Sequence, residues 1–240
     1  VVAVVVAAFA LPASAQNIDK AISAFKKQDY EVAAAQFYAV LRFSEKGEEG
    51  DIAEAQYGLA KSFEKLGLPL AALKYYEDIA KVGSNHPHFD KAVEGLVNVG
   101  EQLEDDLKTP QILDSIYGGE NAPALQKMNP EVLQRVHYVL GRYMFNRQNY
   151  KESREFLNTV KPGNPAYPYA QYMMGLIRLG VGRGDNYAPK YDQATDAFER
   201  ARDAIPKDTV DKKLLDLKDL ANLALARTYY EEAYQLDDGD

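Results

Sequence analysis

The sequence predicts an all-α protein in which about five to six helical hairpins stack into an α-solenoid behind an N-terminal signal peptide. Three observations support this fold class. Apolar residues recur at intervals of three and four, which is the periodicity of amphipathic helices. A pattern of small and aromatic residues repeats about every 40 residues along the chain. The apolar runs are rich in Ala and Leu, and nothing in their spacing favours strands.

The repeat is clearest in the small residues expected in the second helix of each hairpin. Ala33, Ala72, Ser153 and Ala194 are separated by 39, 81 and 41 residues, so one weaker copy is expected near residue 112. A Gly-rich insertion at 180–187 lengthens the last of these copies. Small residues let the two helices of a hairpin approach closely, and stacked neighbours complete a core that one hairpin cannot form. Four copies carry another small residue twelve positions earlier: Ala21, Ala60, Gly100 and Gly141.

These residues resemble a known family. In the second copy, the spacing of the tetratricopeptide repeat (TPR) family is followed by Leu59, Ala60, Phe63, Ala72, Tyr76 and Ile79. Later copies follow it through Leu140-Gly141 with Ser153 and Leu157, Met174-Gly175 with Ala194 and Phe198, and Leu225-Ala226 with Tyr229. The resemblance implies a superhelix whose concave side binds a peptide or helix segment of another protein.

The resemblance also implies which residues line that concave side. Groove positions in TPR proteins lie two residues before the Leu of the Leu-Gly pair, and two and five residues after it. The candidate partner-binding residues are therefore Tyr57, Lys61, Tyr138, Arg142, Phe145, Tyr172, Arg227 and Tyr230, with Glu64, Leu176, Leu179 and Leu223 at the remaining positions. Tyr and Arg often dominate interface energies. The alternative is that these tyrosines pack between neighbouring helices of the solenoid.

The first fifteen residues are predicted to be a cleaved signal peptide. The apolar run 1–11 carries no charge and is too short to span a bilayer, which takes about 20 helical residues. The small residues 13–15 form a cleavage site that would leave Gln16 first. We expect an exported, periplasmic or secreted domain over 16–240 without a stable membrane anchor. We also expect the chain to continue beyond Asp240, where a new hairpin would need its second helix.

The composition excludes several classes of function. The 240 residues include no Cys, which excludes disulfides, thiolate nucleophiles and Cys-containing metal sites. The formal charge of −8 argues against a general nucleic-acid-binding protein, which needs a basic face. The sequence contains no phosphate-binding loop, nucleophile elbow or zinc-protease helix. We therefore predict no catalytic residue and no cofactor.

The three histidines are the remaining candidates for metal chemistry. His86 and His88 flank Pro87 beside Asp90, but they lie in a connecting loop where nothing in the sequence fixes the rings. We expect them to have a capping or solvated role, and we expect His137 to pack in its helix or face solvent. No metal site is predicted.

Taken with the resemblance, these observations predict a non-catalytic protein–protein interaction scaffold of the bacterial cell envelope, whose partner is a component of an envelope complex. An exported chain without Cys is typical of bacterial envelope proteins. Two alternatives remain open. The chain could be the superhelical portion of a larger envelope enzyme such as a lytic transglycosylase, or it could be a glycan-binding module whose tyrosines stack on sugar rings.

Overall fold

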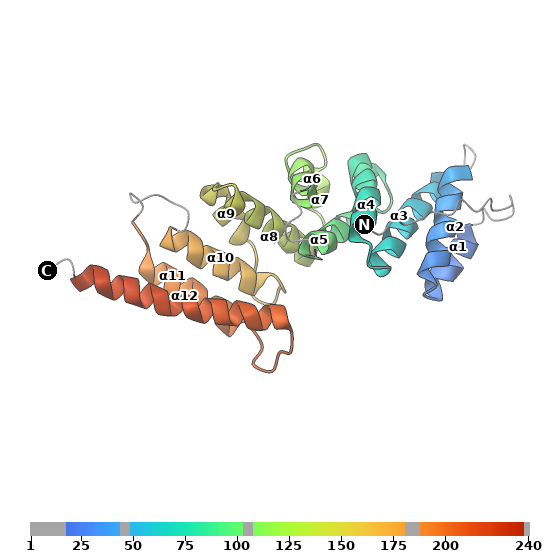
Figure 1. Ribbon diagram of the computed structural model, residues 1–240. Coiled ribbons are helices and arrows are strands. Elements are labelled where there is room, and N and C mark those ends of the chain that lie inside the picture. The colour runs from blue at the N-terminus through green and yellow to red at the C-terminus, as the bar shows by residue number, and fades with distance from the viewer. Residues whose placement is uncertain (1–17, 44–48, 103–107, 181–187, 238–240) are drawn as a thin grey trace. The chain divides into compact units, whose positions relative to one another are not determined.

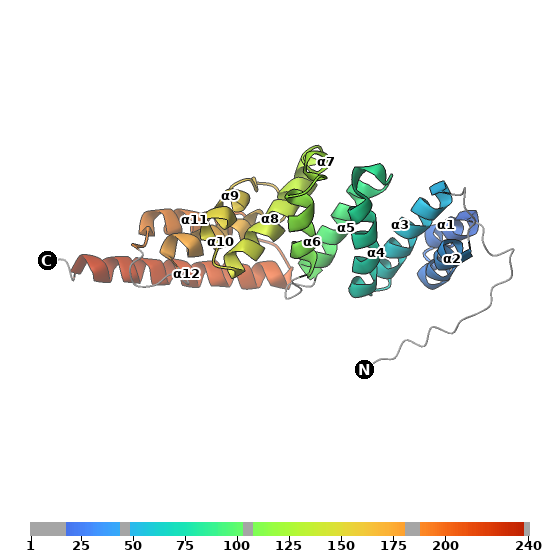
Figure 2. The same ribbon diagram turned by 90° about the horizontal axis from the view of Figure 1, so that it is seen from above.

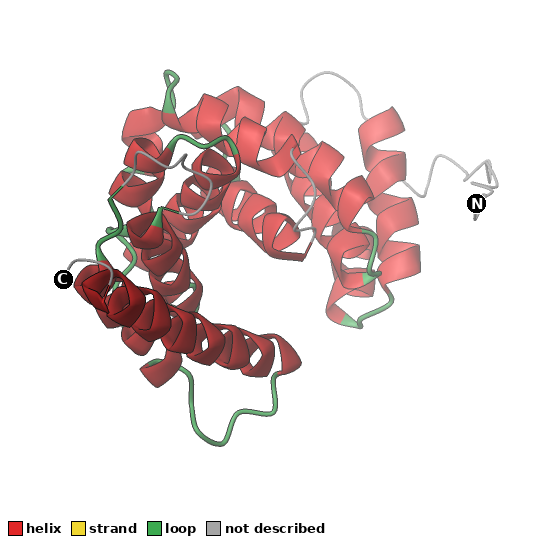
Figure 3. Cartoon of the chain, turned by 60° about the vertical axis from the view of Figure 1, so that its left-hand side comes forward, coloured by secondary structure: helices red, strands yellow, loops and turns green. Residues whose placement is uncertain are grey.

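A computed structural model describes residues 18–43, 49–102, 108–180 and 188–237. These residues form helices and connecting turns, with no strand among them (Figure 3). The all-α prediction is therefore confirmed. The chain divides into two compact units, one ending at Leu125 and the other beginning at Gln126. The predicted signal peptide at 1–15, most of the Gly-rich insertion and the last three residues lie outside the described residues.

The first unit contains three helical hairpins followed by a short helix (Figure 1). Its helices are α1 (Ile18–Lys26), α2 (Tyr30–Phe43), α3 (Glu49–Lys65), α4 (Pro69–Val82), α5 (Phe89–Gln102), α6 (Lys108–Tyr117) and α7 (Ala122–Leu125), with a 3-10 turn at Gly83–Asn85. From α1 to α6, each helix packs against the next one in the chain. The pairs α1–α3, α3–α5 and α4–α6 pack as well. Contacts between successive and next-but-one helices are what a stack of hairpins produces.

The second unit repeats this arrangement with two hairpins and a long final helix (Figure 2). Its helices are α8 (Pro130–Asn146), α9 (Tyr150–Leu157), α10 (Tyr167–Leu179), α11 (Tyr191–Asp203) and α12 (Lys212–Asp237). Successive helices pack on one another, and α8–α10 and α10–α12 form the next-but-one contacts. Helix α12 therefore occupies the place of the first helix of a further hairpin, as the resemblance of Leu225-Ala226 and Tyr229 to that helix predicts.

Three hairpin turns share one backbone geometry. Gln28, Gly67 and Gln148 each adopt a left-handed φ, of 63°, 71° and 61°. In each turn the next residue donates its backbone N–H to the carbonyl five residues earlier, at 2.9–3.0 Å. This pair of features is the Schellman helix terminus, which satisfies carbonyls that a helix end leaves open. The repeated sequence thus produces a repeated turn, although only one of the three uses the Gly that this φ favours.

Helices approach closely wherever a Gly in the first helix of a hairpin faces a large side chain of a second helix. A Cβ added at the Gly would overlap that side chain. The pairs are Gly58 with Phe37, Gly95 with Tyr76, Gly141 with Leu157 and Gly175 with Phe198. The close-approach role predicted for Gly141 and Gly175 is therefore confirmed. Gly95 faces Tyr76 of the preceding hairpin, as Gly58 faces Phe37, so these two glycines serve contacts between hairpins.

Candidate partner-binding site

The second unit has a groove between α10 and α12, two helices that pack on each other and on α11. Both views show α12 running alongside α10 and α11 (Figures 1 and 2). The groove has a volume of about 260 Å³. Its lining comes from Tyr172, Leu176, Leu179 and Gly180 at α10 and from Leu220, Leu223, Ala224, Arg227 and Glu231 of α12. Five of the sequence-derived groove positions therefore lie together around this groove.

The spacing of residues along α12 explains why one side of this helix remains uncovered. Leu217, Ala221 and Leu225 recur every four residues and are buried within the unit. Leu220 and Leu223 lie on another side, because each residue turns the helix by about 100°. Leu223 is 67% exposed although its side chain is wholly apolar. An apolar side chain left in water at the edge of a groove favours association with another apolar surface.

Aromatic and charged groups complete the groove. The ring of Tyr172 packs against Phe198 with centroids 5.6 Å apart. Burial raises the pKa of the Tyr172 phenol. Its hydroxyl is protonated at neutral pH, as an ordinary tyrosine hydroxyl is, and can donate a hydrogen bond. On α12, Arg227 Nε lies 2.6 Å from Glu231 Oε1. The groove is therefore an apolar surface with an exposed ion pair and a tyrosine hydroxyl at its edges.

A second cavity continues from this groove along α12. Its volume is about 250 Å³, and Glu231 lines both cavities. The other lining residues are Pro189, Tyr191, Tyr230 and Tyr234. The rings of Tyr230 and Tyr234 lie 6.4 Å apart and nearly parallel, at 20°. Tyr230, a sequence-derived candidate, therefore belongs to this aromatic extension of the groove.

The fourth repeat places its three candidates differently. Tyr138 is only 8% exposed, and its ring packs against Tyr169, 6.0 Å away between centroids. Arg142 lies over the Tyr138 ring at 5.7 Å. Phe145 meets the Tyr150 ring edge-on at 5.5 Å. Tyr138 therefore packs between neighbouring helices, which is the alternative to groove lining given in the sequence analysis, since little of its ring reaches solvent.

Tyr57 and Lys61 belong to the first unit, where other side chains of the chain engage them. The Tyr57 ring stacks on His88 at 4.8 Å, and Lys91 Nζ lies 5.2 Å from the Tyr57 ring centroid. Lys61 binds Glu64 at 2.8 Å, and Glu64 accepts a hydrogen bond from the Tyr76 hydroxyl at 2.5 Å. Burial, together with Glu64 and other nearby carboxylates, raises the pKa of the Tyr57 phenol.

The histidines of the connecting loop are held in place, contrary to the sequence analysis. His86 is buried and its Nε2 lies 3.0 Å from Gln56 Oε1, while its Nδ1 accepts the backbone N–H of His88. His88 Nε2 lies 2.7 Å from Glu54 Oε2. The expectation that nothing fixes these rings is therefore wrong, because α3 supplies partners about 30 residues away in sequence. Burial, followed by the effect of His88, lowers the pKa of His86.

His137 is buried. Of the two placements expected from the sequence, packing within its helix or facing solvent, the structure shows packing. Its Nδ1 lies 2.7 Å from Thr159 Oγ1, and that hydroxyl donates to the carbonyl of Phe156. Because Thr159 has one hydroxyl proton, Nδ1 of His137 must be the donor in their contact. Burial lowers the pKa of His137 to about 4, so the ring is neutral at neutral pH.

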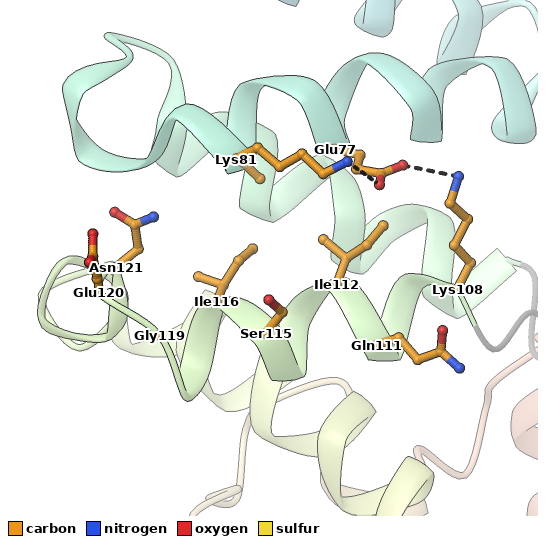
Figure 4. A pocket seen from close by; sticks show the side chains of 11 residues that line it. Glu77, Lys81, Lys108, Gln111, Ile112, Ser115, Ile116, Gly119, Glu120 and Asn121 are labelled. Carbon is orange, nitrogen blue, oxygen red and sulfur yellow. Dashed lines mark ion pairs between the residues drawn. The ribbon is translucent and has the colours of Figure 1, made fainter.

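Sequence reasoning missed a cavity of about 510 Å³ between α4 and α6 in the first unit. Figure 4 shows Lys81 and Lys108 reaching Glu77 from two sides, at 2.8 and 3.0 Å. The two amines lower the pKa of Glu77, with Lys81 making the larger contribution through its hydrogen bond. The i, i+4 spacing of Glu77 and Lys81 signals one ion pair in advance. The contact with Lys108 depends on how α6 packs.

Candidate metal and membrane-spanning features are absent from the described part of the chain. Over 18–43, 49–102, 108–180 and 188–237, no three His, Asp or Glu side chains gather in a way that could hold a metal ion. In the same ranges, no helix is both long and apolar enough to cross a bilayer.

Together, the stacked hairpins and the groove between first helices define a helical repeat protein with a candidate docking surface. Residues 18–87, which include α1 to α4, match the model of the tetratricopeptide repeat family. Among solved structures, the chain is similar to the crystal structure of a thermophilic TPR protein from Thermus thermophilus. The two are 19% identical, with 87% of this chain and 97% of that chain covered and a TM-score of 0.41. No curated protein matches the sequence.

Proposed function

We propose that this protein is a non-catalytic interaction scaffold that binds a segment of another protein in the groove between α10 and α12. Tetratricopeptide repeats generally mediate protein–protein interaction, and their fold is typically a non-catalytic scaffold. The observation that carries the proposal is the position of the exposed apolar side chains. Among the described residues, seven of the thirteen large apolar side chains that are exposed lie between Val210 and Tyr234. Of these seven, Leu220, Leu223, Tyr230 and Tyr234 line the groove and its extension. An exposed apolar patch of this kind marks an interaction site.

The geometry limits what the groove can hold. From Leu220 to Tyr234, α12 advances by about 21 Å, since a helix rises about 1.5 Å per residue. An extended peptide covers that length with about six to seven residues, and a helix needs about fourteen. The two cavities, of about 260 and 250 Å³, suit a few side chains each. The groove therefore fits a short segment of a partner.

Site-specific photo-crosslinking tests this proposal. A benzoylphenylalanine replacing Leu223 should crosslink to a partner protein in cells. The same substitution at Leu70, an equally exposed leucine of α4, should not; the two are 67% and 66% exposed. Leu176→Glu, a change across the groove from Leu223, should abolish the adduct. Equal adducts at Leu70 and Leu223, or an adduct insensitive to Leu176→Glu, would rule out the groove as the binding site.

We further propose that the scaffold acts in the bacterial envelope after export. The apolar run at 1–11 and the small residues at 13–15 support this proposal. The chain expressed in a bacterium with its native N-terminal segment should appear in the periplasmic fraction, and Edman sequencing of that material should begin at Gln16. Recovery of the uncleaved chain from the cytosol would contradict the proposal.

A further inference from the structure

We propose that the cavity formed by Tyr191, Tyr230 and Tyr234 receives an Arg or Lys side chain of the partner segment whose apolar side chains fill the adjoining groove. This inference rests on the proposed function. It adds the chemical character of the segment, a basic residue at a fixed distance from apolar ones.

The lining of this cavity has the chemistry that binds a cation. Three tyrosine rings and the carboxylate of Glu231 surround about 250 Å³, with Pro189 completing the wall. The faces of aromatic rings carry negative electrostatic potential and attract ammonium and guanidinium groups. A carboxylate beside them adds a charged hydrogen-bond acceptor. Arg227 already binds Oε1 of this carboxylate. An apolar partner side chain would contact only the rings, whereas a basic one would also meet the second carboxylate oxygen.

The same chain already pairs cations with tyrosines elsewhere. Arg147 lies 5.3 Å from the Tyr143 ring centroid and donates to the Tyr143 hydroxyl at 2.7 Å. Arg142 and Lys91 lie over other tyrosine rings. Among the residues that the structure describes, no Lys or Arg lies over the ring of Tyr230 or Tyr234, although both are largely exposed. These two rings are therefore available to a cation from outside the chain.

The local charge favours a basic ligand. Burial raises the pKa of the Tyr191 phenol, and the carboxylates of Glu231 and Glu232 raise it further because they lie near the ring. The nearby cations are Arg227, which is bound to Glu231 Oε1, and Lys190, an exposed residue that precedes Tyr191. A partner segment of opposite charge is thus favoured over a second copy of this chain, which would bring the same carboxylates.

The distance between the two cavities sets the spacing in the partner. Leu223 and Tyr230 are seven residues apart on α12, which corresponds to about 10 Å along its axis. An extended segment spans that distance in about three residues, and a helical one in seven. The partner should therefore carry a basic residue three positions from an apolar one if extended, or seven positions from it if helical.

Selection from a random 12-residue peptide library on the immobilised full chain tests this inference. Peptides whose binding is lost with Leu223→Asp define the groove binders. We expect these to carry Arg or Lys at the stated spacing. For a selected peptide, fluorescence anisotropy should show about tenfold weaker binding when its Arg is replaced by neutral citrulline, and when the protein carries Tyr234→Ala.

Two controls separate the possible failures. Tyr38→Ala removes an exposed tyrosine of the first unit and should leave peptide binding unchanged. Tyr234 is exposed, so its truncation should leave the helical circular dichroism intact. This inference is overturned if the groove-binding peptides lack a basic residue, or if they bind the Tyr234→Ala variant with the same affinity as the wild-type protein. The proposed function would stand in either case. A library that yields no Leu223-dependent peptide overturns both.

Discussion

Replacing Gly175 by Ala tests the close packing that holds α10 against α11. A Cβ at this position would lie 2.6 Å from both Cδ1 and Cζ of Phe198. Contacts between carbon atoms are normally about 3.5–4.0 Å, so the ring would have to move by about 1 Å. Phe198 is fully buried, and protein interiors are close-packed with few voids. The substitution should therefore force the two helices apart.

The magnitude follows from two opposing effects. Overpacking a dense core costs about 1–3 kcal/mol. Replacing Gly by Ala inside a helix returns about 1 kcal/mol through higher helix propensity. Because Phe198 is fully buried in a close-packed core, we expect the overlap to dominate and the free energy of unfolding to fall by about 1–2 kcal/mol.

Urea denaturation followed by circular dichroism at 222 nm measures this change. Gly50→Ala is the matched control, because a Cβ at Gly50 of α3 meets nothing within 4 Å. That variant should keep or gain stability, by up to about 1 kcal/mol. In the presence of Phe198→Leu, the cost of Gly175→Ala should shrink, since the smaller side chain relieves the overlap. If Gly175→Ala stabilises the protein as much as Gly50→Ala does, the close-packing argument is wrong.

Two further predictions concern a buried histidine and the hairpin turns. The pKa of His137 lies near 4 in the folded chain against 6.5 unfolded, so stability present above pH 6.5 should be lost as the pH falls toward 4, by about 2–3 kcal/mol at pH 4.5. Denaturation midpoints at pH 7.5 and 4.5 should differ less for His137→Leu than for wild type, and an equal difference would contradict this reasoning. Gln148 adopts a φ of 61°, so Gln148→Gly should stabilise by about 0.5–1 kcal/mol, the relief of left-handed strain less the greater freedom of unfolded Gly. Gly67→Ala, at φ 71°, should destabilise by about 1 kcal/mol, and urea midpoints that shift in the same direction for both variants would refute the turn argument.

Part of the close packing could be predicted from the repeat spacing. Gly141 and Gly175 follow a large apolar residue at the expected position of each first helix, and both receive a side chain of the paired second helix. The close contacts at Gly58 and Gly95 were not predicted, because the large side chains that meet them, Phe37 and Tyr76, come from the preceding hairpin. Sequence spacing within a hairpin reveals contacts inside that hairpin. Contacts between hairpins depend on how far one unit shifts against the next.

The candidate site shows the same division. The spacing along each helix correctly places Tyr172 with Leu176, and Leu223 with Arg227, on single helix faces. It gives no sign of the cavity at Tyr191 and Tyr230, because Tyr191 belongs to another helix, brought alongside α12 by packing. The fixed positions of His86 and His88 were not predicted for a related reason, since their hydrogen-bond partners lie on α3.

The sequence by itself determined that this chain forms helical hairpins and which face of each helix is apolar, since helix periodicity and turn hydrogen bonds are local. Only the tertiary structure decided which of the equivalent groove residues reach solvent. Tyr138, Tyr172 and Leu223 occupy the same repeat position, yet the first is buried, the second half-buried and the third 67% exposed. Tyr169 of α10 packs against Tyr138, and Phe198 of α11 against Tyr172. The physical reason is that the exposure of a side chain depends on which other side chains cover it. For these three residues the covering side chains come from other helices, and tertiary packing decides their positions.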